Sequence, residues 1–166
     1  METVQNNQPP KDLRTFKVFT IEDGTVIDHI DAGQAIKIIR ILNLAEDKTI
    51  VTVGLNLESK EQGHKDLIKV EHRELTKDEA NKVAIFAPNA TINIIRNFKV
   101  AEKFKISIPE TIERLIVCPN PTCITNNERM NSRFHISHEN GSGLTLQCAY
   151  CEKIFSQKNI YEYKSN

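Results

Sequence analysis

Apolar and polar residues alternate along several stretches in the first two thirds of the chain, and this period of two predicts β-strands. The first such stretch covers residues 15–21 and ends at the turn signal Asp23-Gly24. Residues 48–57 and 65–72 follow as a predicted hairpin around a polar turn, and residues 91–98 and 100–108 supply two further strands. Most of these segments are rich in β-branched residues, which favours an antiparallel sheet.

Two intervening segments carry apolar residues at helical spacing. Asp31 can cap the first helix, whose apolar face is broad enough to require a sheet or a partner to cover it. Thr76 and Glu79 form a capping-box pattern at the start of the second, which ends before Pro88. The order strand, helix, strand, strand, helix, strand predicts an α+β fold of the ferredoxin-like, split β-α-β type: an antiparallel sheet with two helices on one face.

The chain divides into three parts by composition. Residues 1–14 are polar, contain Pro9-Pro10 and predict a flexible lead. Residues 15–109 form the sheet-and-helix domain, and residues 110–166 predict a small antiparallel β domain with shorter strands. A domain of that size has a small core, so we expect a bound metal to be its main source of stability, at about 10–16 kcal/mol for structural zinc in small peptides.

All four cysteines lie in the last part of the chain. They form two close pairs, separated by a hairpin-sized segment: Cys118, Cys123, Cys148 and Cys151. This spacing lets four sulfurs converge on one tetrahedral ion and predicts one structural Zn²⁺ without an open coordination position. Two disulfides are the alternative. No secretory signal pattern opens the sequence, however, and we expect a reducing, cytoplasmic location.

Two histidines in the enclosed segment offer alternative ligands. His135 and His138 alternate with apolar residues in Phe134-His135-Ile136-Ser137-His138. That pattern is typical of the polar face of a strand, and four cysteines already complete a zinc site.

Composition and charge narrow the functional classes. The chain is 39% hydrophobic and 27% charged, with 22 basic and 22 acidic residues. From Cys118 onward there are five basic and four acidic residues, so four thiolates and Zn²⁺ bring the metal domain to a net charge of about −1. This argues against binding of nucleic acid by the metal domain. No segment predicts a membrane span.

Separated cations in the first domain are candidate anion ligands. Lys65 and Lys69 share one face of a predicted strand at about 13 Å, four steps of about 3.3 Å. A ligand as long as a nucleoside triphosphate could meet both lysines, and Asp28 could accept hydrogen bonds from ribose. Taken by spacing alone, the pattern is also typical of solvated surface lysines.

A series of short motifs carries a resemblance that covers residues 16–155. The motifs are Gly24-Thr25-Val26-Ile27-Asp28-His29-Ile30, Ile50-Val51-Thr52-Val53-Gly54-Leu55-Asn56-Leu57, Lys65-Asp66-Leu67-Ile68-Lys69, Ala87-Pro88, Cys118-Pro119-Asn120 and Cys148-Ala149-Tyr150-Cys151-Glu152-Lys153. In this order they resemble the regulatory chains of aspartate carbamoyltransferase.

The resemblance implies a non-catalytic subunit. Its first domain would bind CTP, UTP or ATP as effectors of pyrimidine biosynthesis, and its zinc domain would dock on the catalytic chain. Regulatory chains would pair through their first domains, and three such dimers would join two catalytic trimers.

The resemblance also implies a set of nucleotide-binding residues. They are Val18, Thr20, Ile21, Val26, Asp28, His29, Lys65, Lys69, Asn93, Ile95, Phe98, Val100 and Lys103. In this set Asp28 would bind ribose, Lys103 and His29 would face phosphates, and Lys69 with backbone groups near Ile21 would read the base.

The chain departs from the family pattern at Phe19, where an acidic residue is common, at Phe98, where tyrosine is common, and in its longer lead. Two other functional classes stay open on residues alone. A nucleic-acid-binding zinc protein needs a basic stripe that the charges do not provide. An enzyme needs a nucleophile and base in a recognisable arrangement, and none is evident.

Overall fold

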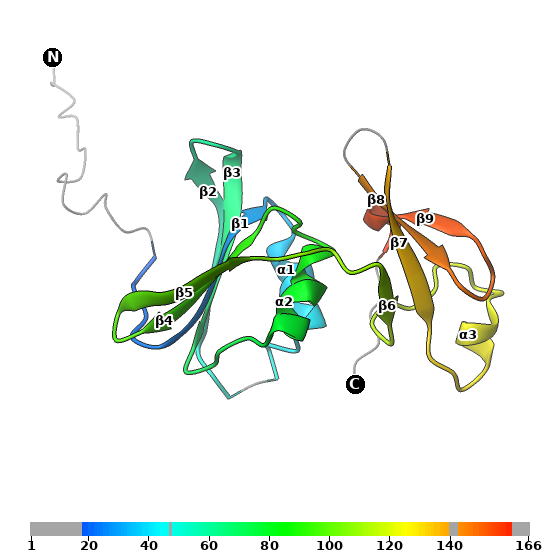
Figure 1. Ribbon diagram of the computed structural model, residues 1–166, viewed down its shortest axis with the longest axis horizontal. Helices are drawn as coiled ribbons and strands as arrows, with labels where there is room; N and C mark the ends of the chain where they lie inside the picture. The colour runs from blue at the N-terminus through cyan, green and yellow to red at the C-terminus, as the bar shows by residue number, and fades with distance from the viewer. Residues whose placement is uncertain (1–17, 47, 140–142, 161–166) are drawn as a thin grey trace, which may run out of the picture.

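The computed structural model describes residues 18–46, 48–139 and 143–160, and Figure 1 shows two lobes joined by the segment after β5. The predicted lead, residues 1–14, lies outside the described residues. Among those that are described, no helix has the length and hydropathy needed to cross a bilayer.

The first lobe is a five-stranded antiparallel sheet in the order β2-β3-β1-β4-β5. Its strands are β1 (Gly24–Asp31), β2 (Val51–Ser59), β3 (Gly63–Glu71), β4 (Thr91–Arg96) and β5 (Lys99–Lys105). The predicted hairpin is confirmed, because β2 pairs with β3, and the two further predicted strands also pair with each other, as β4 and β5. The α+β fold class, with an antiparallel sheet and helices, is confirmed as well.

Both helices of this lobe cover the same face of the sheet (Figure 1). They are α1 (Ala35–Ile41) and α2 (Lys77–Ala84). The covered face carries Ile27, Ile68 and Ile92, paired across three neighbouring strands and fully buried. Because successive side chains of a strand alternate between faces, the residues between them point to the uncovered face.

The predicted start of the second helix is confirmed. The Thr76 hydroxyl accepts a hydrogen bond from the Glu79 N–H at 3.2 Å, and the Glu79 carboxylate accepts from the Thr76 N–H at 2.9 Å. This reciprocal capping box satisfies donors that the first turn leaves without helical partners.

Two sequence predictions near the start of the chain are wrong. Residues 18–21 are not in a strand, and the first strand instead begins at Gly24, within the predicted turn. Gly24 has φ +137°, which permits a sharp entry into β1. The first helix begins at Ala35 with Gln34 as N-cap, and not at Asp31, because residues 32–34 form a turn.

The second lobe is a four-stranded antiparallel sheet in the order β6-β7-β8-β9. It comprises β6 (Thr111–Glu113), α3 (Ile124–Asn127), β7 (Arg133–Glu139), β8 (Gly143–Cys148), β9 (Ile154–Ser156) and the 3-10 turn η2 (Gln157–Asn159). The predicted small β domain of short strands matches this lobe.

The two lobes pack against each other through the segment that follows β9, residues 157–160. Ile160 is fully buried and Phe86, just beyond α2, is 1% exposed, and both belong to one continuous group of buried apolar residues. The Gln157 side-chain amide donates to the Ile85 carbonyl. The residues that follow the metal-lobe sheet therefore contact the C-terminal end of α2.

Candidate functional site

The four cysteines form a compact cluster in the second lobe. Their sulfur atoms all lie within 4.8 Å of one another, and no disulfide joins them. The Cys118 and Cys151 sulfurs are 3.7 Å apart, and the Cys123 and Cys148 sulfurs are 3.8 Å apart. A tetrahedral Zn²⁺ with Zn–S bonds of about 2.3 Å has S···S edges of about 3.8 Å, so this spacing fits zinc.

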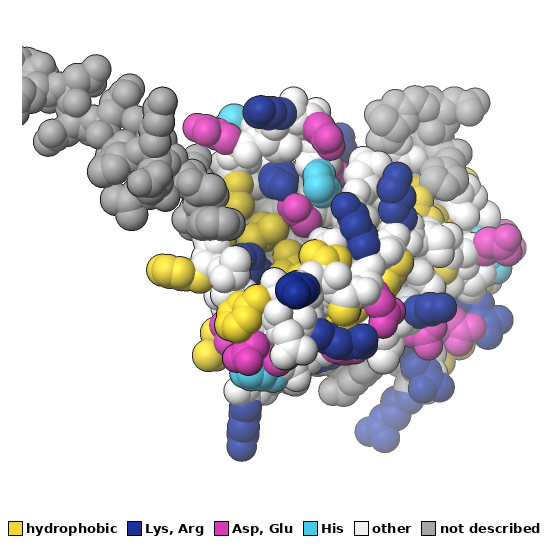
Figure 2. Space-filling view, turned by 60° about the vertical axis from the view of Figure 1, so that its left-hand side comes forward, with side chains coloured by type: hydrophobic (Ala, Val, Ile, Leu, Met, Phe, Trp, Pro, Cys, Tyr) yellow, Lys and Arg dark blue, Asp and Glu magenta, His cyan; other side chains and the backbone are white. Residues whose placement is uncertain are grey.

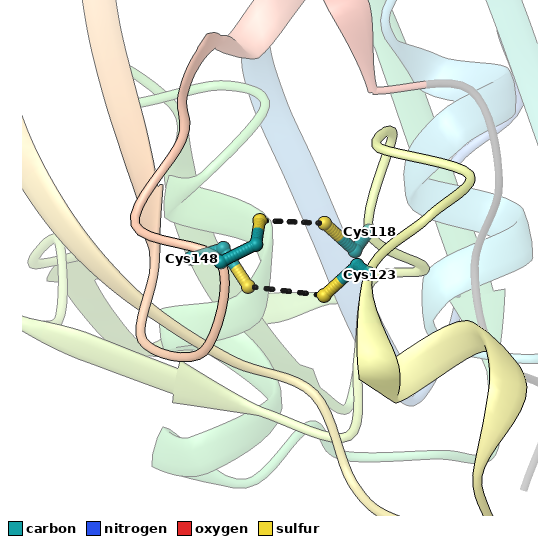
Figure 3. Close-up of side chains that lie close together, drawn as sticks. Cys118, Cys123 and Cys148 are labelled. Atoms are coloured by element: carbon teal, nitrogen blue, oxygen red, sulfur yellow. Dashed lines mark hydrogen bonds between the residues drawn. The ribbon is translucent and has the colours of Figure 1, made fainter.

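Two loops carry these ligands and face one another (Figure 3). On the first loop, α3 begins directly after Cys123, and the Asn126 amide donates to the Cys118 carbonyl at 2.8 Å. On the second, the Cys148 N–H donates to the Lys153 carbonyl at 3.0 Å, which closes the turn that holds Cys151. Hydrogen bonds inside each loop thus hold the cysteines in place.

Burial and hydrogen bonding act differently on the pKa values of the cysteine thiols. Burial raises the pKa of Cys118 and of Cys148, so packing alone opposes their thiolate forms. Burial would do the same to Cys123, but hydrogen bonds from the Thr125 hydroxyl and N–H lower its pKa to about 7. Four thiolates at this spacing need a cation to offset their repulsion, and four protein sulfurs leave no position for a reacting ligand.

His135 does not belong to this cluster. It lies on β7 with its side chain exposed, and its Nδ1 is 3.3 Å from the Thr111 hydroxyl. His138 lies on the same strand, and its side chain is outside the described part of the structure. The described cysteines alone supply the four ligands.

A cavity of about 660 Å³ lies on the uncovered face of the first sheet. Figure 2 shows this face, where basic and acidic side chains surround a hollow with hydrophobic walls. The lining residues are Val18, Thr20, Ile21, Val26, Asp28, Leu57, Glu58, Lys65, Leu67, Lys69, Ile95, Phe98 and Val100. Its volume is in the range of small-molecule sites, about 300–1,000 Å³.

Lys65 and Asp28 form an ion pair at this cavity. The Lys65 ammonium is 2.7 Å from one Asp28 carboxylate oxygen, and the His29 N–H donates to the same oxygen at 2.7 Å. Burial would raise the pKa of Asp28, but these hydrogen bonds and the positive charge of Lys65 outweigh burial and lower it. Asp28 is therefore an anion whose second oxygen can accept further hydrogen bonds.

Lys69 makes contacts of another kind. Its ammonium donates to the Val18 carbonyl at 3.3 Å and also to the Phe19 carbonyl. Burial lowers the pKa of Lys69, and the nearby charge of Asp28 partly opposes that shift. Lys69 thus ties residues 18–19, which lead into the cavity wall, to β3.

Strand register brings further predicted residues to the same face. Lys69 pairs with Val26, Val26 with Asn93, and Asn93 with Lys103, so these four side chains form one row across β3, β1, β4 and β5. Asn93 and Lys103 do not line the cavity itself but extend its face toward β5.

His29 occupies an unusual backbone position. It lies at a register shift in β1, and its φ of 58° falls in the left-handed region, which residues other than glycine seldom adopt. Its Nδ1 is 3.6 Å from Asp28 and its Nε2 is 3.7 Å from the Glu61 carboxylate. The imidazole is therefore beside the cavity, between two acids, and does not line it.

A buried carboxylate supports the lysine-bearing strand from the other face. Asp66 is fully buried and accepts hydrogen bonds from the N–H groups of Gly33, Ala35 and Asn56 at 2.8, 3.2 and 2.9 Å. Asp66 lies on β3 between Lys65 and Leu67. Its hydrogen bonds connect this strand to the start of α1 and to the bulge in β2.

Comparison with known proteins covers both lobes. Residues 16–107 match the family described as aspartate carbamoyltransferase regulatory chain, allosteric domain, and residues 110–161 match the metal binding domain of the same chain. The chain belongs to the aspartate carbamoyltransferase regulatory chains. It is a regulatory subunit, and the carbamoyltransferase activity is that of a separate catalytic chain.

Individual regulatory chains are similar over nearly their whole length. The chain from Chromobacterium violaceum is 45% identical over 153 residues, which cover 90% of this chain and 98% of that one. The Methanococcus maripaludis chain is 49% identical, with 86% and 95% covered, and the Pyrococcus horikoshii chain is 46% identical, with 87% and 95% covered. The four-cysteine cluster lies in the metal binding domain of this regulatory chain and fits one structural zinc ion.

The structure brings most of the expected nucleotide-binding residues of this regulatory chain together. Ten of the thirteen line the cavity, and His29, Asn93 and Lys103 lie beside it. Leu57, Glu58 and Leu67 also line it but were not predicted. Alternation along β3 could have indicated Leu67, since it lies two residues from Lys65 and from Lys69. The position of Leu57 depends on the register shift between β2 and β3 that begins after Gly54, which the sequence does not specify.

Proposed function

We propose that this regulatory chain binds nucleoside triphosphates in the cavity on the uncovered sheet face and thereby controls a catalytic chain docked on its zinc lobe. The observation that carries the proposal is the union, in one cavity, of an anionic Asp28, two lysines of β3 and apolar walls. The nucleotides are CTP, UTP and ATP, and the controlled step is the carbamoyl transfer of pyrimidine biosynthesis.

Different residues in and beside the cavity can contact the ribose, the phosphates and the base of a nucleotide. The free oxygen of Asp28 can accept from ribose hydroxyls, while Lys103 on the same sheet face and His29 beside Asp28 can meet phosphates. Lys69 holds the backbone of residues 18–19 and so positions the neighbouring Ile21 backbone against the base.

Phe98 offers an apolar surface at the mouth of this cavity. It is 63% exposed and lies with Asn97 in a hairpin turn in which both residues have positive φ, 60° and 51°. Its N–H donates to the Glu22 carbonyl at 2.9 Å, which ties this turn to the segment before β1. The ring is therefore available to cover a bound base.

The zinc lobe is the proposed docking surface for the catalytic chain. Three large apolar residues next to the zinc loops are exposed: Ile124 by 51%, Tyr150 by 42% and Ile154 by 65%. Exposed apolar side chains next to ordered loops are typical of protein interfaces. The thiols organise these loops but take no part in catalysis.

The two domains of the chain have separate roles in the proposed assembly. Residues 15–109 act as the allosteric domain and residues 110–166 as the docking domain, after a lead of residues 1–14. Regulatory chains pair through their first domains, and three pairs join two catalytic trimers. Free cysteines fit the cytoplasm, where this assembly would work.

Reconstitution tests this function. The zinc-loaded chain is mixed with an aspartate carbamoyltransferase catalytic chain, association is followed by sedimentation velocity, and the rate is measured with and without each nucleotide. We expect a complex whose rate responds to at least one of the three nucleotides. A zinc-loaded chain that forms no complex, or a complex indifferent to all three, would contradict the proposal.

A pair of variants tests the docking surface. Tyr150→Ser should weaken association while leaving the zinc content at one per chain. Ile50→Ser is the control, since Ile50 is 62% exposed on the first lobe, away from the zinc loops. Equal association by both variants would show that the Tyr150 surface is not used.

A further inference from the structure

A second cavity, of about 600 Å³, lies between the two lobes. The first lobe contributes Gln34 and Lys37 of α1, together with Phe86 and Asn89 after α2. The second lobe contributes Leu144 of β8 and Lys158 of η2. This cavity is separate from the nucleotide cavity, which lies on the sheet face that the helices leave uncovered.

The walls of this cavity are anchored on both sides. Phe86 is 1% exposed, Leu144 is 4% exposed, and Ile160 just beyond η2 is fully buried. The Gln157 amide donates to the Ile85 carbonyl, which joins η2 to the end of α2. The polar side chains of the cavity therefore lie beside a contact between the lobes that is closely packed.

Two lysines line this cavity from opposite lobes, Lys37 and Lys158. Among the described residues, neither Lys37 nor Lys158 has a carboxylate within ion-pair distance. The Lys37 ammonium is 5.8 Å from the centre of the Phe86 ring. The side-chain amides of Gln34 and Asn89 likewise make no hydrogen bond within the described part of the chain. Cations and amides with unused donors beside apolar walls are typical of a site for a small anion.

Among the residues that the structure describes in this lining, Asp31 is the acidic one, and the two lysines outnumber it. Asp31, at the end of β1, accepts a hydrogen bond at 3.4 Å from the side-chain amide of Gln62. Burial raises the pKa of Asp31, which disfavours its charged form. Two lysines against one partly buried carboxyl favour a ligand of negative charge.

We propose that this cavity binds a small anionic metabolite whose carboxylate or phosphate group is held between Lys37 and Lys158. The donors of Gln34 and Asn89 lie beside that position, and Phe86 and Leu144 leave room for a short carbon skeleton. A ligand held by one lysine from each lobe bridges the lobes and fixes their relative position. The site thus offers a second route of control, independent of nucleotide binding.

An NMR titration of the zinc-loaded full chain tests the site with two probes, inorganic phosphate and malonate, at constant ionic strength. We expect saturable amide shifts at Lys37, Asn89 and Lys158, with no matching shifts at Val26 and Lys69 in the nucleotide cavity. The probe with the lower dissociation constant identifies the preferred anionic group. Absence of saturable shifts with both probes would overturn the proposal.

Variants show whether the two lysines hold the anion. Lys37→Gln and Lys158→Gln should each weaken binding about tenfold, because each removes one charge-assisted contact. Lys77→Gln, an exposed position at the start of α2, is the matched control and should bind as the unchanged chain does. Retained zinc content and a dispersed spectrum confirm folding. Equal affinity in all three variants would show that the shifts report only general ionic effects.

Discussion

The Lys65 ammonium lies 2.7 Å from the Asp28 carboxylate and joins neighbouring strands β3 and β1 at the cavity where we propose that nucleotides bind. Both side chains are only partly exposed, by 20% and 24%. Removal of either partner therefore leaves a partly buried charge without its counterion, which costs more than the loss of a surface pair.

This ion pair predicts a pH dependence of stability. Because the pKa of Asp28 is lowered from its ordinary value of 3.8, the folded state favours the carboxylate, so this contribution is present above that value and is lost as the pH falls through the lower, folded pKa. As the pH falls from about 5 to about 3, the free energy of unfolding measured with urea should therefore decrease less for Asp28→Asn than for the unchanged chain.

The control for this comparison is Glu128→Gln, an exposed position outside the cavity for which we expect the same acid sensitivity as in the unchanged chain. Acid loss of zinc affects all three proteins and cancels in the difference. If Asp28→Asn and the unchanged chain lose the same free energy of unfolding, the Asp28 carboxylate is not stabilised by folding.

Two lysines on the uncovered face should affect nucleotide binding for different reasons. Lys103→Ala removes a cation from the phosphate end, and Lys69→Ala releases the carbonyls of residues 18–19. We expect affinity for CTP to fall about tenfold or more in each, measured by calorimetry. Lys77→Ala, on α2, should leave it unchanged. Wild-type affinity in both cavity variants would be evidence against this placement of the nucleotide.

Removal of zinc should act first on the second lobe. After chelation we expect hydrogen exchange to accelerate throughout β6–β9 and at the end of α2, where Phe86 loses its cover, while β1–β5 stay protected. Mass spectrometry of exchanged peptides measures this difference, and thiol titration should show four reactive cysteines only after chelation. Equal loss of protection in both lobes would contradict the division into two domains.

Two glycines allow a matched test of the entry into β1. An added Cβ at Gly24 would lie 2.0 Å from the Val70 carbonyl oxygen, whereas at Gly63 it would meet nothing within 4 Å. Both residues have positive φ, so Gly63→Ala should cost about 1–2 kcal/mol from backbone conformation alone. Gly24→Ala should cost clearly more in chemical unfolding, and equal costs would show that β1 can shift away from β3.

The sequence predicted the repeating features of the fold well. Alternation identified the hairpin of β2 and β3 and the strands β4 and β5, and Thr76 with Glu79 identified the start of α2, because these signals depend on neighbouring residues. The entry into β1 was mispredicted, since the strong alternation of residues 15–21 is local whereas β1 is held by pairing with β3 and β4, which are distant in sequence.

The candidate sites differ in how far sequence could specify them. Cys118, Cys123, Cys148 and Cys151 follow from spacing, because a tetrahedral site needs two close pairs. The nucleotide residues came from the family resemblance. The Lys65–Asp28 pair and the buried Asp66 required strand register, and the cavity between the lobes required the packing of η2 on α2, for which the sequence has no local signal.

Nucleotides should bind at one regulatory site on this chain. Calorimetric titration of the zinc-loaded chain with CTP, repeated in the presence of ATP, tests it most directly. We predict saturable binding near one site per chain, weakened when ATP is present and weakened about tenfold or more in Lys69→Ala. No binding of either nucleotide by the folded, zinc-containing chain would contradict it.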